Sequence, residues 1–181
     1  MIKWLLRQGL KAFEKHYDYD ASYAHFILDT SVRAAWKFAR VMGLANYRQD
    51  VPAEASVAAG LVTTMAEDCG PCTQLGVTMA ERQGVAPSII RAILDGDERA
   101  MTPDAALAYR FAQATLRHDP AADALREQIV ARWGRRALVS LAFTITAGRM
   151  FPTLKYALGF GKSCSIIKVG STQTTVTHKA A

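Results

Sequence analysis

Two cysteines separated by two residues, Cys69 and Cys72, have the clearest chemical capacity in this chain. Because the spacing is short, the two sulfurs can close into a disulfide and reopen to a dithiol, and such pairs lower a thiol pKa toward neutral pH. Between them stand Gly70 and Pro71, and proline is accepted at the first helical positions because their amides lack helical partners. The sequence therefore predicts redox chemistry at the start of a helix.

Two carboxylates, Glu67 and Asp68, stand directly before this pair. Their charges would raise a thiol pKa by repulsion, whereas the positive end of the helix dipole would lower it. A carboxylate within hydrogen-bonding distance of a sulfur, directly or through one water, can also accept a proton. Glu67 is therefore a candidate catalytic residue beside Cys69 and Cys72, with helix capping at the surface as its alternative role.

The surrounding sequence argues against two other uses of a Cys-x-x-Cys motif. A zinc site needs further ligands, and His25 and His118 are remote and have no partner at ligand spacing. A thioredoxin needs a buried strand before the motif, whereas an alanine-rich helical pattern precedes Cys69. We therefore expect no metal and no bound cofactor. The third cysteine, Cys164, is predicted to be a small packed residue rather than a resolving thiol.

Helical patterns surround the motif and would have to position it. Apolar residues recur at helical spacing over 2–15, 21–44, 53–66, 72–83, 87–94, 102–116, 119–133 and 136–150. The second segment is predicted to break near Asp29–Ser31, which could cap a new turn, and Thr102–Asp104 has a cap signature. Phe151 and Pro152 are predicted to bend or restart the chain into a short helix ending at Gly159. Few runs apart from 165–169 alternate with period two, so the predicted fold is all-α.

Length and composition favour one soluble domain. The chain has 181 residues, half of them hydrophobic and 21% charged, and no run of about 18 apolar residues to span a membrane. We expect an N-terminal helical region over 1–50 that packs on a core over 51–165, followed by a polar tail over 166–181. Arg7 and Lys11 interrupt any signal-peptide core, and three cysteines are too few for a disulfide scaffold, so a cytoplasmic location is predicted.

The net charge of +6 is concentrated at the two ends of the chain. From residue 131 onward there are basic residues and no Asp or Glu, yet no nucleic-acid-binding motif accompanies them, which favours a solvated face or a subunit contact over nucleic-acid binding. Residues 2–15 form a basic amphipathic pattern. Packing on the domain or on a neighbouring subunit is favoured for it over contact with a membrane surface.

Several segments together suggest a family. An alanine-rich helix leads into Cys69–Leu75, Met79–Val85 follows, and Tyr17–Asp20 and Phe151–Lys155 lie near the two ends. In these segments the chain resembles the alkylhydroperoxidase D and carboxymuconolactone decarboxylase superfamily. The resemblance extends over most of the chain and is best over 53–97. It implies an alkylhydroperoxidase D-like helical domain, with Cys-x-x-Cys at the start of a core helix, that assembles into trimers or their multiples.

The resemblance also implies roles for the cysteines. In the peroxidase members the second cysteine attacks the peroxide and becomes a sulfenic acid, the first resolves it as a disulfide, and a thiol donor regenerates the pair. Those roles would fall on Cys72 and Cys69. Thioredoxins use the opposite order, and the sequence leaves the order open.

Two positions depart from the family's peroxidase pattern. The family has a histidine four residues after the second cysteine, where this chain has Gly76, and a relay glutamate that falls here near Val57. The nearest acids are Glu54 and Glu67. Losing a general base typically costs on the order of 10²- to 10⁴-fold in rate. Decarboxylase activity is less favoured still, because the lactone-decarboxylating members do not depend on a cysteine pair.

The sequence thus predicts an oxidoreductase that uses Cys69 and Cys72. It would be a thiol-dependent, antioxidant peroxidase of peroxiredoxin type or a dithiol–disulfide oxidoreductase, with a hydroperoxide substrate, a thiol electron donor and a homo-oligomeric assembly. The alternative is a non-catalytic or redox-sensing helical oligomer of the same fold. A purely structural interpretation, in which the cysteines are packed thiols, gives no reason for Gly-Pro between them.

Overall fold

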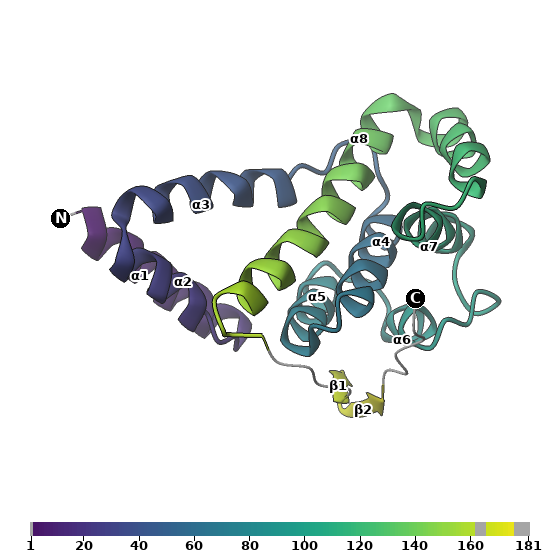
Figure 1. Ribbon diagram of the computed structural model, residues 1–181. Helices are drawn as coiled ribbons and strands as arrows, with labels where there is room; N and C mark the ends of the chain where they lie inside the picture. The colour runs from purple at the N-terminus through teal and green to yellow at the C-terminus, as the bar shows by residue number, and fades with distance from the viewer. Residues whose placement is uncertain (1, 162–165, 176–181) are drawn as a thin grey trace.

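The computed structural model describes residues 2–161 and 166–175, and these residues confirm the all-α class (Figure 1). The helices are α1 (Ile2–Tyr17), α2 (Ser22–Thr30), α3 (Val32–Ala45), α4 (Ala53–Ala66), α5 (Gly70–Arg82), α6 (Pro87–Asp95), α7 (Pro103–Leu116) and α8 (Ala121–Ala157). A hairpin of two short strands, β1 (Ile166–Val169) and β2 (Thr172–Thr175), follows them.

The main core is built around α4, which packs on α7, α8, α5 and α6. Small residues make close approach possible: Ala55, Ala58 and Ala59 of α4 are fully buried, and so are Ala105 and Ala108 of α7. Alanine both favours the helix and lets a second helix approach closely, so α4 and α7 pack closely against each other. Larger buried side chains from α6 and α8 complete the core, among them Ile90, Ile93, Ile129 and Leu141.

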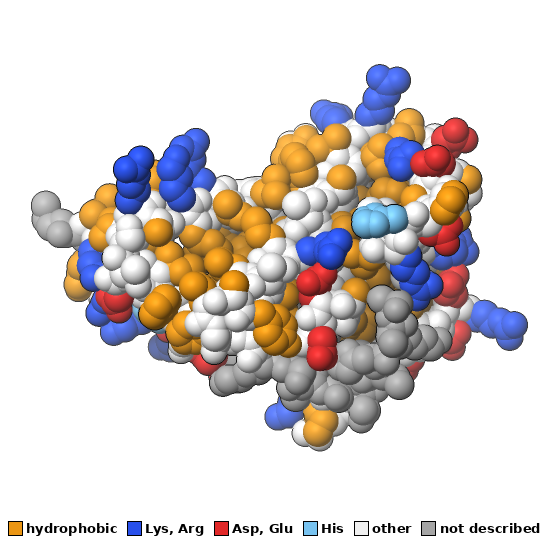
Figure 2. Space-filling model, viewed as in Figure 1, with side chains coloured by type: hydrophobic (Ala, Val, Ile, Leu, Met, Phe, Trp, Pro, Cys, Tyr) orange, Lys and Arg blue, Asp and Glu red, His pale blue; other side chains and the backbone are white. Residues whose placement is uncertain are grey.

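A second, thinner layer is formed by α1, α2 and α3. The predicted break in this region is confirmed: α2 ends at Thr30, and the Ser31 hydroxyl caps α3 by accepting a hydrogen bond from the Ala34 amide at 3.2 Å. No residue of α1 or α3 is buried. In Figure 1, α3 and α8 diverge from each other, and Figure 2 shows hydrophobic side chains in the recess between them.

The long helix α8 contains one break and lacks another that the sequence suggested. Gly134 has φ 85° and ψ 174°, so the two predicted helices, over 119–133 and 136–150, meet there at a kink. The predicted restart at Phe151 and Pro152 is wrong, since the helix continues through Pro152 to Ala157. Pro152 is fully buried, and the packing of its ring offsets the backbone hydrogen bond that a proline cannot make.

By length and composition alone, α8 could cross a membrane, and it is the one helix in residues 2–161 and 166–175 that could. Core helices of soluble proteins meet the same criterion, and 33% of the most apolar stretch of α8 is buried within the fold. The kink at Gly134 lies between Arg132 and Arg136. This geometry is compatible with a soluble protein.

The start of the predicted polar tail is instead part of the folded body. Ile167 and Val169 of β1 are buried in the main core. The Gln74 side chain of α5 pairs with the strand backbone: its amide oxygen accepts from the Lys168 amide at 2.8 Å and its NH₂ donates to the Lys168 carbonyl at 3.1 Å. The short alternating run indicated a strand, but it gave no sign that the strand would pair with β2 and pack against α5. Cys164 lies outside the described residues.

Candidate functional site

The two cysteines lie where α4 turns into α5. Asp68 adopts a left-handed conformation with φ 49°, which a short polar residue tolerates, and it reverses the chain after α4. Cys69 occupies the N-cap position of α5, Pro71 follows in the first turn, and Cys72 completes that turn. The Cα atoms of Cys69 and Cys72 are 5.2 Å apart, and their sulfurs form a disulfide. The Thr64 carbonyl accepts the Cys69 amide at 3.3 Å and holds the turn against α4.

The two sulfurs differ in their surroundings. Cys69 is 1% exposed, and it is enclosed by the protein. Cys72 is 8% exposed and lines a cavity of about 490 Å³. A molecule that enters this cavity therefore meets Cys72 rather than Cys69.

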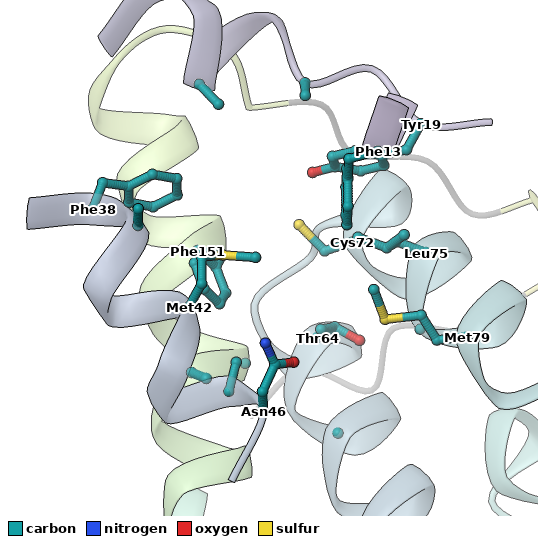
Figure 3. Close-up of a pocket in the computed structure, with 18 of the residues that line it drawn as sticks. Phe13, Tyr19, Phe38, Met42, Asn46, Thr64, Cys72, Leu75, Met79 and Phe151 are labelled. Atoms are coloured by element: carbon teal, nitrogen blue, oxygen red, sulfur yellow. The ribbon is translucent and has the colours of Figure 1, made fainter. Parts of the chain in front are cut away.

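The cavity lies between the two layers of the fold. Its walls come from α1, α2 and α3 on one side and from α4, α5 and α8 on the other. Figure 3 shows Phe13 of α1, Met42 of α3 and Phe151 of α8 around it, with Leu75 beside Cys72. This lining is mainly apolar, and a volume of several hundred cubic ångströms is typical of small-molecule sites.

Few polar groups face the cavity. No His, Asp or Glu is among the described residues that line it. The Thr73 hydroxyl, next to Cys72, donates to the Thr64 hydroxyl at 3.2 Å. Burial raises the pKa of the Tyr19 and Tyr23 hydroxyls, so both stay protonated at neutral pH. Among the described residues, the lining therefore contains no carboxylate or imidazole that could serve as a general base.

The acidic candidates from the sequence are held elsewhere. Glu67 accepts a hydrogen bond from the Arg149 guanidinium at 2.8 Å and does not line the cavity. Glu54 accepts a hydrogen bond from the Thr102 hydroxyl and stands in the first turn of α4, whereas the cysteines follow its last turn. The structure thus brings Cys69 and Cys72 together and ties Glu67 to α8.

The two histidines that the sequence offered as ligands, His25 and His118, lie outside the cavity. His25 lies 3.1 Å from the Glu14 carboxylate, between α2 and α1, and His118 has φ 54° just after the end of α7. Within residues 2–161 and 166–175, no three His, Cys, Asp or Glu side chains are grouped so that they could hold a metal ion.

Apolar packing occupies the two positions where the resemblance places a proton relay. A Cβ atom added at Gly76 would lie 2.9 Å from Leu61 Cδ2, so the Leu61 side chain of α4 takes the space beside it. Val57 is 7% exposed and lines the cavity. A larger side chain at position 76 would require Leu61 to move.

The sequence did not indicate the cavity or several of its polar lining residues, among them Ser56, Asn46 and Arg48. One signal was present: Ser56, Gly60 and Thr64 recur every four residues and so share a face of α4. Small residues on one face predict close packing as readily as a cavity. The distinction depends on what α3 and α8 place opposite, which the sequence of α4 does not contain.

Searches of protein families, curated proteins and solved structures found no match to this chain. The class of this protein is therefore described from its fold and its site. It is an all-α protein with a buried Cys-x-x-Cys disulfide at the edge of an apolar cavity.

Proposed function

We propose that this protein is a thiol-dependent peroxidase or dithiol–disulfide oxidoreductase with an alkylhydroperoxidase D-like fold, in which Cys69 and Cys72 form the redox centre. The observation that carries the proposal is the asymmetry of the pair: Cys72 lines the cavity, and Cys69 is enclosed. A cysteine that meets an external substrate and a second one within bonding distance are the two parts that such chemistry requires.

The proposed cycle begins with the reduced pair. The Cys72 thiolate attacks one oxygen of a hydroperoxide, the O–O bond breaks, and the alkoxide that leaves takes a proton to become an alcohol. Cys72 is now a sulfenic acid. The Cys69 thiol attacks its sulfur, water leaves, and the disulfide forms. Two thiols of an electron donor then reduce the disulfide and are themselves oxidised to a disulfide.

The position of the pair supports thiolate formation. The first turn of α5 places its free amides and the positive end of the helix dipole beside the sulfurs, which favours an anion. Because the described residues of the cavity supply no general base, we expect peroxidase turnover slower than with an imidazole, by about 10²- to 10⁴-fold. Glu67 remains a candidate proton acceptor only if it leaves Arg149.

The absence of a base among the described lining residues also favours a second candidate, a non-catalytic or redox-sensing helical oligomer. Exposed large hydrophobic residues would supply subunit contacts: Trp4 is 62% exposed, Trp36 53% and Val139 42%. In this case oxidation of the pair would change the assembly rather than turn over a substrate. A trimer or a multiple of it is the assembly that we propose for either candidate.

The test is to mix reduced protein with one equivalent of hydrogen peroxide or of an organic hydroperoxide and to follow peroxide loss and intact mass. The peroxidase predicts peroxide loss together with a mass decrease of two hydrogen atoms, and, once excess peroxide and a thiol donor are supplied, loss of turnover in both Cys69→Ser and Cys72→Ser. If peroxide persists while a disulfide-exchange partner oxidises the pair, the protein is a dithiol oxidoreductase or a sensor. If neither oxidant reacts, the redox proposal is wrong.

A further inference from the structure

The hydroxyl of Ser56 has no partner. Ser56 is 3% exposed, and its Oγ is the one buried side-chain polar atom among the described residues that makes no hydrogen bond. Helical hydroxyls elsewhere on α4 bond to an earlier carbonyl, as Thr63 does to Ala59 at 2.8 Å. Ser56 does not, and it lines the cavity. A buried hydroxyl left unpaired is unfavourable, so this atom marks a place where a ligand's polar group fits.

The cavity is also basic at one end. Asn46, Arg48, Met79 and Gln83 line both the apolar cavity and a neighbouring hollow, to which Arg82 adds a second guanidinium. No Asp or Glu is among the described residues around either space.

The two guanidiniums at this end differ in how firmly they are held. Arg82 donates to the His16 backbone carbonyl and lies over the Tyr17 ring, with its Cζ 5.2 Å from the ring centroid. Arg48 forms no ion pair within the described part of the chain, and its charge is therefore available to an anion.

The basic end and the sulfur lie at opposite ends of the cavity. Thr64 contacts Thr73, and an added Cβ at Gly76 would contact Leu61, so α4 and α5 run antiparallel. This arrangement directs Ser56 toward the C-terminal end of α5, where Arg82 and Gln83 lie. Ser56 and Thr64 are eight residues apart, or about 12 Å along the helix axis. A ligand that reaches from Ser56 to Cys72 must therefore be elongated.

The wall between the two ends is apolar. Leu61, Leu75, Met42 and Phe151 line it, and Figure 3 shows the last three around Cys72. A hydrocarbon chain matches this wall because burying its surface removes apolar area from water, and a single anionic group matches Arg48 and Ser56.

We propose that this cavity binds one long-chain fatty acid, with its carboxylate at the end marked by Arg48 and Ser56 and its chain extended along α4 and α5 toward Cys72. This binding does not depend on redox activity. One consequence rests on the proposed function: a hydroperoxide carried on such a chain would be the substrate class of Cys72.

The test is displacement of a fluorescent fatty acid from the oxidised full-length protein by palmitate, below the concentration at which palmitate forms micelles. We expect saturable binding of one palmitate per chain. Arg48→Ala should weaken binding about tenfold because a charge-assisted hydrogen bond is lost. Arg126→Ala, which removes an exposed arginine paired with Asp123, is the matched control and should leave binding unchanged. Hexadecanol, which has the chain without the charge, should displace the probe at least tenfold less well than palmitate.

Two further variants separate a ligand site from a structural feature. Ser56→Ala should weaken binding and raise the melting temperature of the free protein, because an unpaired buried hydroxyl is removed. Met42→Trp should abolish binding by filling the cavity.

The proposal is overturned by several results. These are the absence of saturable binding, equal displacement by hexadecanol and palmitate, or unchanged affinity in both Arg48→Ala and Ser56→Ala. If no palmitate binds and light scattering gives the molar mass of an oligomer, the cavity is covered by a second copy of the chain instead of a fatty acid. Because the protein is oxidised throughout, loss of peroxidase activity would not affect any of these outcomes.

Discussion

The two faces of α4 differ in how they are packed. One face carries alanines that are fully buried in the main core, Ala55, Ala58 and Ala59. The other carries Ser56, Gly60 and Thr64, which line the cavity. The same helix thus joins a tightly packed core to an open space, and the difference arises from what lies opposite each face. Cys72 lines the open side.

The layer opposite the open face is loosely packed. In α1 and α3 no residue is buried, whereas α4 and α7 are buried along most of their length. A helix that buries little apolar surface gains little from packing, so the N-terminal layer is expected to open at a lower free energy than the core. An opening layer would give a substrate access to Cys72 without unfolding the core.

The largest predicted difference in stability is between replacing a phenylalanine in the main core and replacing one in the N-terminal layer. Phe111 of α7 is 4% exposed in the main core, and Phe111→Ala should destabilise the protein by about 3–5 kcal/mol through lost burial and the cavity that remains. Phe13 of α1 is half-buried at the cavity wall, and Phe13→Ala should cost less than half as much. Chemical denaturation followed by circular dichroism measures both. Equal losses would show that the N-terminal layer is as tightly packed as the core.

A smaller loss of stability is predicted for a change where the β1–β2 hairpin meets α5. Gln74→Ala removes two hydrogen bonds to the backbone of Lys168 and should cost about 1–2 kcal/mol. Gln173→Ala, on the exposed neighbouring strand, is the matched control and should change stability by less than about 0.5 kcal/mol. Hydrogen exchange of the hairpin amides would rise in the first variant only. If exchange and stability were unchanged, the hairpin would not belong to the tightly packed part.

The smallest effect on stability is predicted for the ion pair of Asp29, which joins α1 to α2. A hydrogen bond from Lys3, at 3.1 Å, and then the charge of Arg7 lower the pKa of Asp29 below its ordinary 3.8, against the desolvation that raises it. Because the folded-state pKa is the lower one, this stabilisation is present above pH 3.8 and is lost as the pH falls through the folded-state value.

Melting temperatures from neutral pH down through this range test the ion pair. Asp29→Asn should show a shallower acid dependence than the wild type, and high salt should reduce the difference because the pair is exposed. Parallel acid profiles for the two proteins would exclude a role for Asp29 in holding the N-terminal layer.

The sequence was most informative where local signals decide the structure. Ser31, within the predicted break at Asp29–Ser31, and Thr102, within the predicted cap at Thr102–Asp104, cap helices because a hydroxyl before a helical pattern bonds to the free amide three residues on. Gly134 separates the two predicted segments of α8 because it can adopt a positive φ. Pro152 misled the prediction, since its burial, which the sequence does not report, lets the helix continue.

The site was predictable only in part. The spacing of Cys69 and Cys72 pointed to a sulfur pair, and the structure joins them. The residues next to Glu67 in the sequence do not indicate that Arg149, 82 residues later, binds its carboxylate. The cavity depends on α1, α3 and α8 together, so no single segment indicated Arg48 or the unpaired Ser56.

The most direct test of the account asks which sulfur attacks. Reduced Cys69→Ser and Cys72→Ser, both in a Cys164→Ser background, are treated with an organic hydroperoxide in the presence of dimedone, and the adducts are measured by intact mass. The account predicts a sulfenic acid adduct on Cys72 in the first variant and little or none on Cys69 in the second, because Cys72 lines the cavity and Cys69 is enclosed. An adduct that forms faster on Cys69 would contradict it.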